Sequence, residues 1–194
     1  NITIAEHSKC LQLMVACIFC DYEFAWKMSE KLDQFHQYFS GSILPYICAF
    51  YRGLAAISML NMTKSTQCSG TVKSCLKQLR KGRKVSPANL SHHSYLLEAE
   101  YAAFRKKYTQ AEKFYLMAIE KAALAGAIHE QAIACERFGA YHLLRENHDA
   151  TYEQIIAAHR LYMKWGARPK CEMLKNKYPR LGERAVINVR MHSI

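Results

Sequence analysis

The chain has 194 residues, 51% of them hydrophobic, and a formal net charge of +11. It is therefore long and apolar enough to bury a core, which excludes a disordered chain. Only 8 glycines and 4 prolines are present, and this scarcity favours helices over a sheet of many short strands. No basic stretch leads into an apolar one at the start, so no signal peptide is predicted, and because residue 1 is Asn we expect a piece of a longer chain.

The N-terminal half is predicted to hold two pairs of helices. In the first pair, the segment 10–35 reads as two helices joined at the sequence CDYE, and Gly41 is predicted to close the pair. In the second pair we predict helices at Leu44–Met62 and Thr71–Arg80, a loop over 63–70 and a linker over 81–87.

The apolar segment 43–60 is long enough to be considered as a membrane span. It has Pro45 near its start and Arg52 in its middle, and an arginine at the centre of a span costs at least ~2.5 kcal/mol. We therefore predict a buried helix with Arg52 reaching the edge of the core, and no transmembrane span.

The C-terminal half repeats itself after forty residues without gaps, and small residues recur in both copies at intervals of twelve, seven and eight. A small residue in mid-helix lets the next helix cross closely, an interval of seven keeps two of them on one face, and a following glycine ends the helix. The repeat therefore predicts helical hairpins. The small residues are Ala99, Ala111, Ala118 and Gly126, then Gly139, Thr151, Ala158 and Gly166.

Helix boundaries in this half follow from the 3.6-residue period and from capping residues. Thr109 is predicted as an N-cap, and Trp165 is predicted to be buried against the last helix. The predicted helices are Leu90–Lys107, Thr109–Ala125, Ile128–Glu146, Asp149–Trp165 and Pro169–Lys177. The whole chain is predicted as one solenoid over 1–178, with pairs at about 5–40, 43–81, 90–126 and 128–166, a capping helix at 169–177, and an extended or disordered basic tail at 179–194.

Three segments resemble the helical-repeat region of large signalling ATPases and hybrid sensor kinases: HHSYLLEAEYAAF (92–104), HEQAIACERFGAYHL (129–143) and LYMKWGARPKCEMLKNKYP (161–179). The resemblance implies an all-α, tetratricopeptide-like right-handed superhelix of antiparallel hairpins, about nine helices in all, which holds protein partners in signal transduction. The phosphate-binding loop and the kinase motifs of those large proteins do not occur in this sequence. We therefore predict a non-enzymatic scaffold with no catalytic residues and no cofactor.

In such a superhelix the first helix of each pair lines a concave groove, and the resemblance carries this role to eight positions. These residues are mixed apolar and acidic, which suits a peptide or helix that carries basic residues. The alternative of equal weight is that neighbouring helices or the chain's own tail cover them. The eight are His93, Leu96, Glu100, Ala103, Ile133, Glu136, Ala140 and Leu143.

Positive charge gathers at 80–84 and in the last 36 residues, which have nine Lys or Arg against two acids. This pattern supports an alternative function, a basic helical-repeat subunit of a large assembly that docks on RNA, acidic protein or a membrane surface. The plainer interpretation is solvated helix ends, which we favour because no nucleic-acid-binding motif is present. The candidate docking residues are Arg80, Lys81, Arg83, Lys84, Arg168, Lys170, Lys175 and Lys177.

The eight cysteines lack the spacing of a disulfide framework, so we predict reduced thiols in an intracellular protein of the cytoplasm or an organelle. Cys17 and Cys20 form a C-x-x-C with His7 and Cys10 nearby. In one helix the thirteen residues from His7 to Cys20 span about 20 Å, too far for one tetrahedral zinc site. We predict no metal, and a buried stripe of His7, Cys10, Met14 and Cys17.

Overall fold

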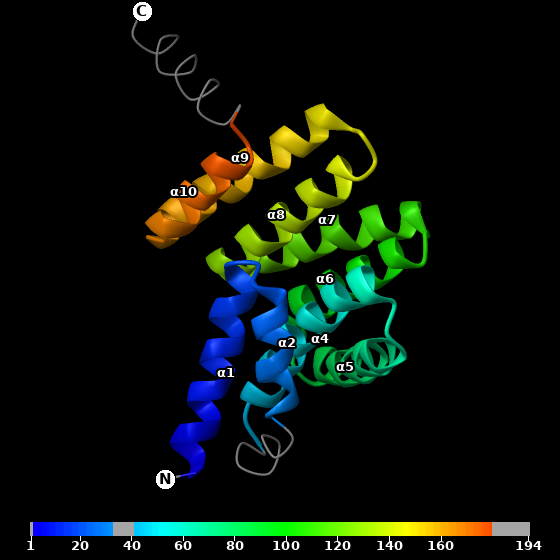
Figure 1. The fold of residues 1–194 in the computed structure, drawn as a ribbon, viewed down its shortest axis with the longest axis vertical. Helices are drawn as coiled ribbons and strands as arrows, with labels where there is room; N and C mark the ends of the chain where they lie inside the picture. Colours follow the sequence, from blue (N-terminus) through cyan, green and yellow to red (C-terminus); the bar gives the residue numbers. More distant parts are fainter. Residues whose placement is uncertain (1, 33–40, 180–194) are drawn as a thin grey trace, which may run out of the picture. The chain divides into compact units, whose positions relative to one another are not determined.

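The computed structural model describes residues 2–32 and 41–179, and within them the chain is all-helical, with no strand (Figure 1). The predicted all-α class is therefore confirmed. The chain divides into two compact units, Asn1–Lys121 and Ala122–Ile194, and the single solenoid stays a prediction. The helices are α1 (Ile2–Ile18), α2 (Tyr22–Glu30), α4 (Leu44–Thr63), α5 (Thr66–Val85), α6 (Pro87–Phe104), α7 (Tyr108–Leu124), α8 (Ile128–Leu143), α9 (His148–Trp165) and α10 (Arg168–Lys177).

Helix α4 is the centre of the first unit and packs against α1, α2, α5 and α6. Its large side chains Phe50, Leu54 and Ile57 are fully buried. The crossing with α6 is close, since a Cβ built at Gly53 would lie 2.4 Å from Cδ2 of Leu97. The predicted buried helix is thus present, and across the ranges 2–32 and 41–179 no helix combines the length and hydrophobicity of a membrane span.

The connections around α5 differ from the prediction. Only two residues separate α4 from α5, because Lys64 takes a left-handed conformation (φ 58°) that ends α4, so the predicted loop over 63–70 is mostly helix. The predicted linker over 81–87 is also largely helical, since α5 continues to Val85. Gly82 permits this, because a Cβ there would meet the Tyr46 ring at 2.6 Å. Both glycines of α5 therefore lie within a helix, at positions that were predicted to be loop and linker.

The second unit consists of α8, α9 and α10, with α9 packed against both neighbours. The predicted glycine caps are confirmed: Gly126 and Gly166 have φ of 67° and 89°, where a side chain would be strained. At the other end of α9 the Asn147 side chain accepts a hydrogen bond from the backbone N–H of Ala150. Thr109 lies inside α7, which begins at Tyr108, so its predicted N-cap role is wrong.

The small residues of the forty-residue repeat occupy the close crossings, as predicted. Ala99, Ala111, Ala118, Thr151 and Ala158 are all buried. Gly139 lies where a Cβ would be 2.8 Å from Cδ1 of Ile155, so α8 and α9 touch through this position.

The prediction for Trp165 is wrong. Its side chain remains 40% exposed and stacks on the ring of His129 in α8, with ring centroids 4.9 Å apart and planes 18° apart. Helix α10 instead contributes Lys170, Cys171 and Leu174 to the core of the second unit, all fully buried.

The predicted stripe on α1 is half right. Cys10 and Cys17 are buried, Met14 is half-buried and His7 is exposed. Cys20 does not continue this face because its backbone is left-handed (φ 61°). The Asp21 N–H donates to the carbonyl of Ala16, and the Cys20 N–H donates to the carbonyl of Cys17. This Schellman arrangement ends α1 and reverses the chain into α2.

We expect Cys20 to be the first cysteine to react with a thiol reagent. It is half-exposed, whereas the other seven cysteines are buried thiols. Burial also raises the pKa of Cys75 to about 11 and of Cys135 to about 12. A short pulse of iodoacetamide at neutral pH, read by peptide mass spectrometry, should modify Cys20 faster by roughly tenfold or more. Equal labelling of all eight thiols in the folded chain, as expected in urea, would contradict the described core.

Candidate functional site

The eight residues predicted to line a groove lie on α6 and α8. On α6, His93, Leu96 and Glu100 are buried and Ala103 is half-buried. On α8, the arrangement is similar: Ile133 and Glu136 are buried, Ala140 is half-buried and Leu143, at the helix end, is exposed. Five of the eight side chains therefore do not form an open surface.

The two carboxylates of this set are already occupied within the chain. Tyr115 donates its hydroxyl to Oε1 of Glu100 at 2.7 Å. Glu136 accepts from the Tyr162 hydroxyl at 2.9 Å and from Nζ of Lys170 at 2.8 Å. A basic partner would have to break these buried interactions, so the acids serve the packing of each unit and not a docking surface.

The first basic cluster is partly structural. Nε of Arg80 lies 2.6 Å, and Nη1 of Arg83 3.0 Å, from the two carboxylate oxygens of buried Glu98, so α5 is tied to α6. Lys81 and Lys84 are exposed and remain available for an acidic partner.

The second basic set needs one correction. Lys170 is 0% exposed and ion-paired with Glu136, so its predicted docking role is wrong. Lys175 pairs with Glu172 on the surface, and Arg168 and Lys177 are exposed. A lysine reaches such a buried position only because a carboxylate and a tyrosine ring surround its charge, which the sequence pattern does not reveal. Of the basic tail predicted at 179–194, residues 180–194 lie outside the described residues.

An apolar surface that sequence reasoning missed lies on α1 and α2. Cys10, Leu13 and Cys17 face the core from α1, while Ile4, Leu11 and Val15 form a second stripe that is 68%, 49% and 50% exposed. The spacing of this second stripe, seven and then four residues, was visible in the sequence. A helix that is apolar on two sides and buried on one lacks a partner on the other.

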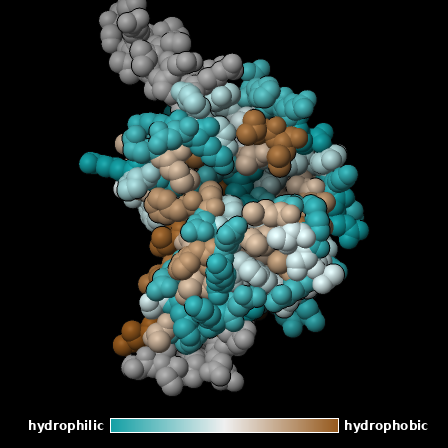
Figure 2. Space-filling model, viewed as in Figure 1, coloured by the Kyte–Doolittle hydropathy of each residue, from teal (hydrophilic) through white to brown (hydrophobic). Residues whose placement is uncertain are grey.

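The turn between the helices extends this surface. Asp21 is the N-cap of α2, and its side chain accepts a hydrogen bond from the backbone N–H of Phe24. The second helix therefore begins shortly after Phe19. Both phenylalanines remain at least 40% exposed. Together these side chains border a shallow cavity of about 420 Å³, the α1–α2 groove, and Figure 2 shows brown, apolar surface along the edge that α1 forms. The groove is lined by Ser8, Leu11, Gln12, Val15, Ala16, Phe19, Asp21 and Phe24.

Comparison of the sequence with models of protein families, and of the chain with curated proteins and with solved structures, finds no match. The helices define an all-α protein. The resemblance to the repeat region of signalling ATPases and kinases therefore stays a prediction.

Proposed function

We propose that the chain is a non-enzymatic protein-interaction scaffold, of the kind that joins modules in signalling ATPases and kinases, and that the α1–α2 groove is its docking surface. The observation that carries the proposal is the exposure of Ile4, Leu11 and Val15 on one face of α1, next to Phe19 and Phe24. Contiguous exposed apolar side chains with a polar rim mark interaction sites.

The shape of the surface indicates the partner. Helix α1 has 17 residues, about 25 Å at ~1.5 Å per residue, so it can support a partner helix of several turns. The groove is lined by no lysine, arginine or glutamate, and exposed aromatic side chains stand at its end. Such a surface suits an amphipathic helix that inserts apolar side chains at i, i+4 and i+7. The single acid, Asp21, favours a basic residue at one end of that helix.

Leu11→Glu and Val15→Glu are expected to weaken partner binding by roughly tenfold or more each, because they place a charge in the apolar contact. Both side chains are about half exposed, so the variants should keep the stability of the chain. Partners would first be captured from native extract by a photo-crosslinking amino acid at Val15 and identified by the cross-linked peptide. Their affinity for each variant would then be measured by calorimetry with that peptide.

Leu116→Glu supplies the matched control. Leu116 lies on α7 of the same unit and is 57% exposed, so the substitution is chemically identical but distant in sequence from the groove. The proposal is wrong if no peptide is cross-linked at Val15, or if Leu116→Glu weakens binding as much as Leu11→Glu.

Salt dependence separates this proposal from the basic-subunit alternative. Docking through Lys81, Lys84, Arg168 and Lys177 on RNA or a lipid headgroup would weaken steeply as salt rises. Apolar docking on α1 should change little with salt.

A further inference from the structure

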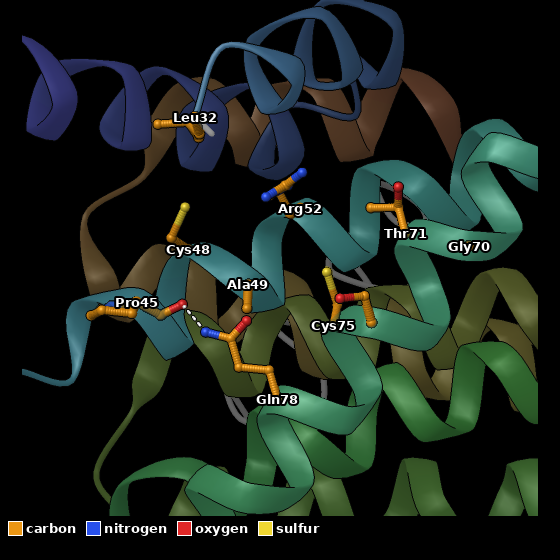
Figure 3. Close-up of a pocket in the computed structure, with 10 residues that line it drawn as sticks. Leu32, Pro45, Cys48, Ala49, Arg52, Gly70, Thr71, Cys75 and Gln78 are labelled. Atoms are coloured by element: carbon orange, nitrogen blue, oxygen red, sulfur yellow. Dashed lines mark hydrogen bonds between the residues drawn. The ribbon is translucent and has the colours of Figure 1, made fainter. Parts of the chain in front are cut away.

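A cavity of about 330 Å³ lies in the first unit between α4 and α5 (Figure 3). Each helix contributes one face to it, at positions three, four and seven residues apart. The side chains along these two faces are mostly small, which leaves space that large side chains would fill. The lining residues are Leu32, Pro45, Cys48, Ala49, Arg52, Gly70, Thr71, Ser74, Cys75 and Gln78.

Among the described residues, Arg52 is the only charged one that lines the cavity. Its Nε is inaccessible to solvent and has no hydrogen-bond partner among the described residues. In Figure 3 the Arg52 guanidinium and the Cys48 thiol point from α4 toward the side where Leu32 lies. A guanidinium has five N–H donors, and in a protein interior it is normally matched by an anion.

The neighbouring thiols do not provide this anion. A hydrogen bond with Cys10, then burial, raises the pKa of Cys48, and burial raises the pKa of Cys75 to about 11. The positive charge of Arg52 opposes both shifts without reversing them. Cys48 and Cys75 are therefore neutral at neutral pH, and none of the described residues that line the cavity is an acid that could balance the charge of Arg52.

The remaining polar groups can contact a bound molecule. The hydroxyls of Thr71 and Ser74 come from successive turns of α5. The amide of Gln78 is held in place because its Nε2 donates to the backbone carbonyl of Pro45 at 3.1 Å. Leu32, Pro45 and Ala49 supply the apolar part of the lining.

We propose that this cavity binds a small organic monocarboxylate, with the carboxylate on Arg52 and the hydrocarbon part against Leu32 and Ala49. A guanidinium forms two parallel hydrogen bonds with a carboxylate. One arginine balances one negative charge, whereas a phosphate monoester carries about −1.5 to −2 and needs further cations. The volume suits a ligand of this size. The site is independent of the α1–α2 groove.

The probes are acetate, butyrate and hexanoate, titrated into the full chain by calorimetry while the side-chain Nε signal of Arg52 is followed by NMR. At least one is expected to bind saturably and to shift that signal. Butyramide, which has the shape of butyrate without its charge, should not bind. Failure of all three acids to bind overturns the proposal, and so does equal binding of butyramide or tighter binding of inorganic phosphate.

Arg52→Met is expected to weaken binding of the preferred acid by roughly tenfold or more, and Arg52→Lys to weaken it less, since lysine keeps the charge but loses the fork. Thr71→Leu fills the cavity while Arg52 remains, so it should also abolish binding. Circular dichroism and Trp26 fluorescence confirm folding of each variant. If Arg52→Met does not fold, binding by Thr71→Leu tests the proposal instead. If either variant folds and binds the acid with unchanged affinity, the carboxylate site is contradicted.

Discussion

Replacement of Lys170 by methionine is expected to lower the free energy of unfolding of the second unit by about 3–5 kcal/mol. The ammonium group is fully buried and lies 2.8 Å from Oε1 of Glu136, whose other oxygen accepts from Tyr162. Without Lys170 the carboxylate loses its cationic partner, whereas the neutral Tyr162 hydroxyl still donates to it. Removal of one partner of a buried ion pair is costly because the other charge stays buried.

The double variant Lys170→Met/Glu136→Gln should recover roughly half of that loss, because neither partner then carries a charge. Lys175→Met is the matched control on the same helix. Lys175 pairs with Glu172 where both side chains are largely exposed, so its removal should cost at most ~0.5 kcal/mol.

Urea unfolding followed by tryptophan fluorescence measures these differences. The chain has two tryptophans, and Trp26→Phe leaves Trp165, which lies in the second unit, as the single tryptophan. Stacking of Trp165 on His129 makes its emission sensitive to unfolding. A loss below about 1 kcal/mol for Lys170→Met would mean that the lysine reaches water in solution.

The second unit shows what the sequence could predict. The forty-residue spacing placed Gly126 and Gly166 at helix ends and Gly139 at a crossing, and the structure agrees at all three. These predictions succeed because a left-handed turn and a close approach each demand a small residue.

The errors have a different origin. Gly82 was predicted to lie in a linker, but it lies within α5, where the Tyr46 ring packs in the place of a side chain. Lys170 was read as surface charge, and only the fold brings Glu136, 34 residues away in sequence, to within hydrogen-bond distance. Propensity describes a residue in its local segment, whereas these positions are decided by neighbours on other helices.

The exposed stripe of α1 was predictable only in part. Its period was readable, yet a second apolar stripe shows only that a helix has two faces to cover. Whether both faces are covered depends on tertiary packing, and in this chain one is left open. The Arg52 cavity was beyond prediction, because it arises from the register of two facing helices.

Gly139→Ala is expected to destabilise the second unit by about 1–2 kcal/mol, although alanine is the better helix former by ~1 kcal/mol. The added Cβ would lie 2.8 Å from Cδ1 and 2.9 Å from Cγ1 of Ile155, and 3.3 Å from the backbone oxygen of Thr151. Ile155 is fully buried and cannot move aside, so α8 and α9 would have to separate.

Replacement of Gly70 by alanine should have the opposite effect on stability. A Cβ at Gly70, in an exposed position of α5, meets nothing within 4 Å, so Gly70→Ala should stabilise the first unit by about 0.5–1 kcal/mol. With Trp165→Phe, the fluorescence of Trp26 reports on that unit.

A double-mutant cycle then tests the contact itself. Ile155→Val removes the Cδ1 methyl nearest to the new Cβ, so Gly139→Ala/Ile155→Val should lose less stability than the sum of the two single variants. The interaction energy is expected at about 0.5–1 kcal/mol, measured by urea unfolding with Trp165 as the fluorophore. If the stability losses of the two single variants simply add, the loss from Gly139→Ala does not arise from its contact with Ile155. That result would argue against the close crossing that the forty-residue repeat predicts for α8 and α9.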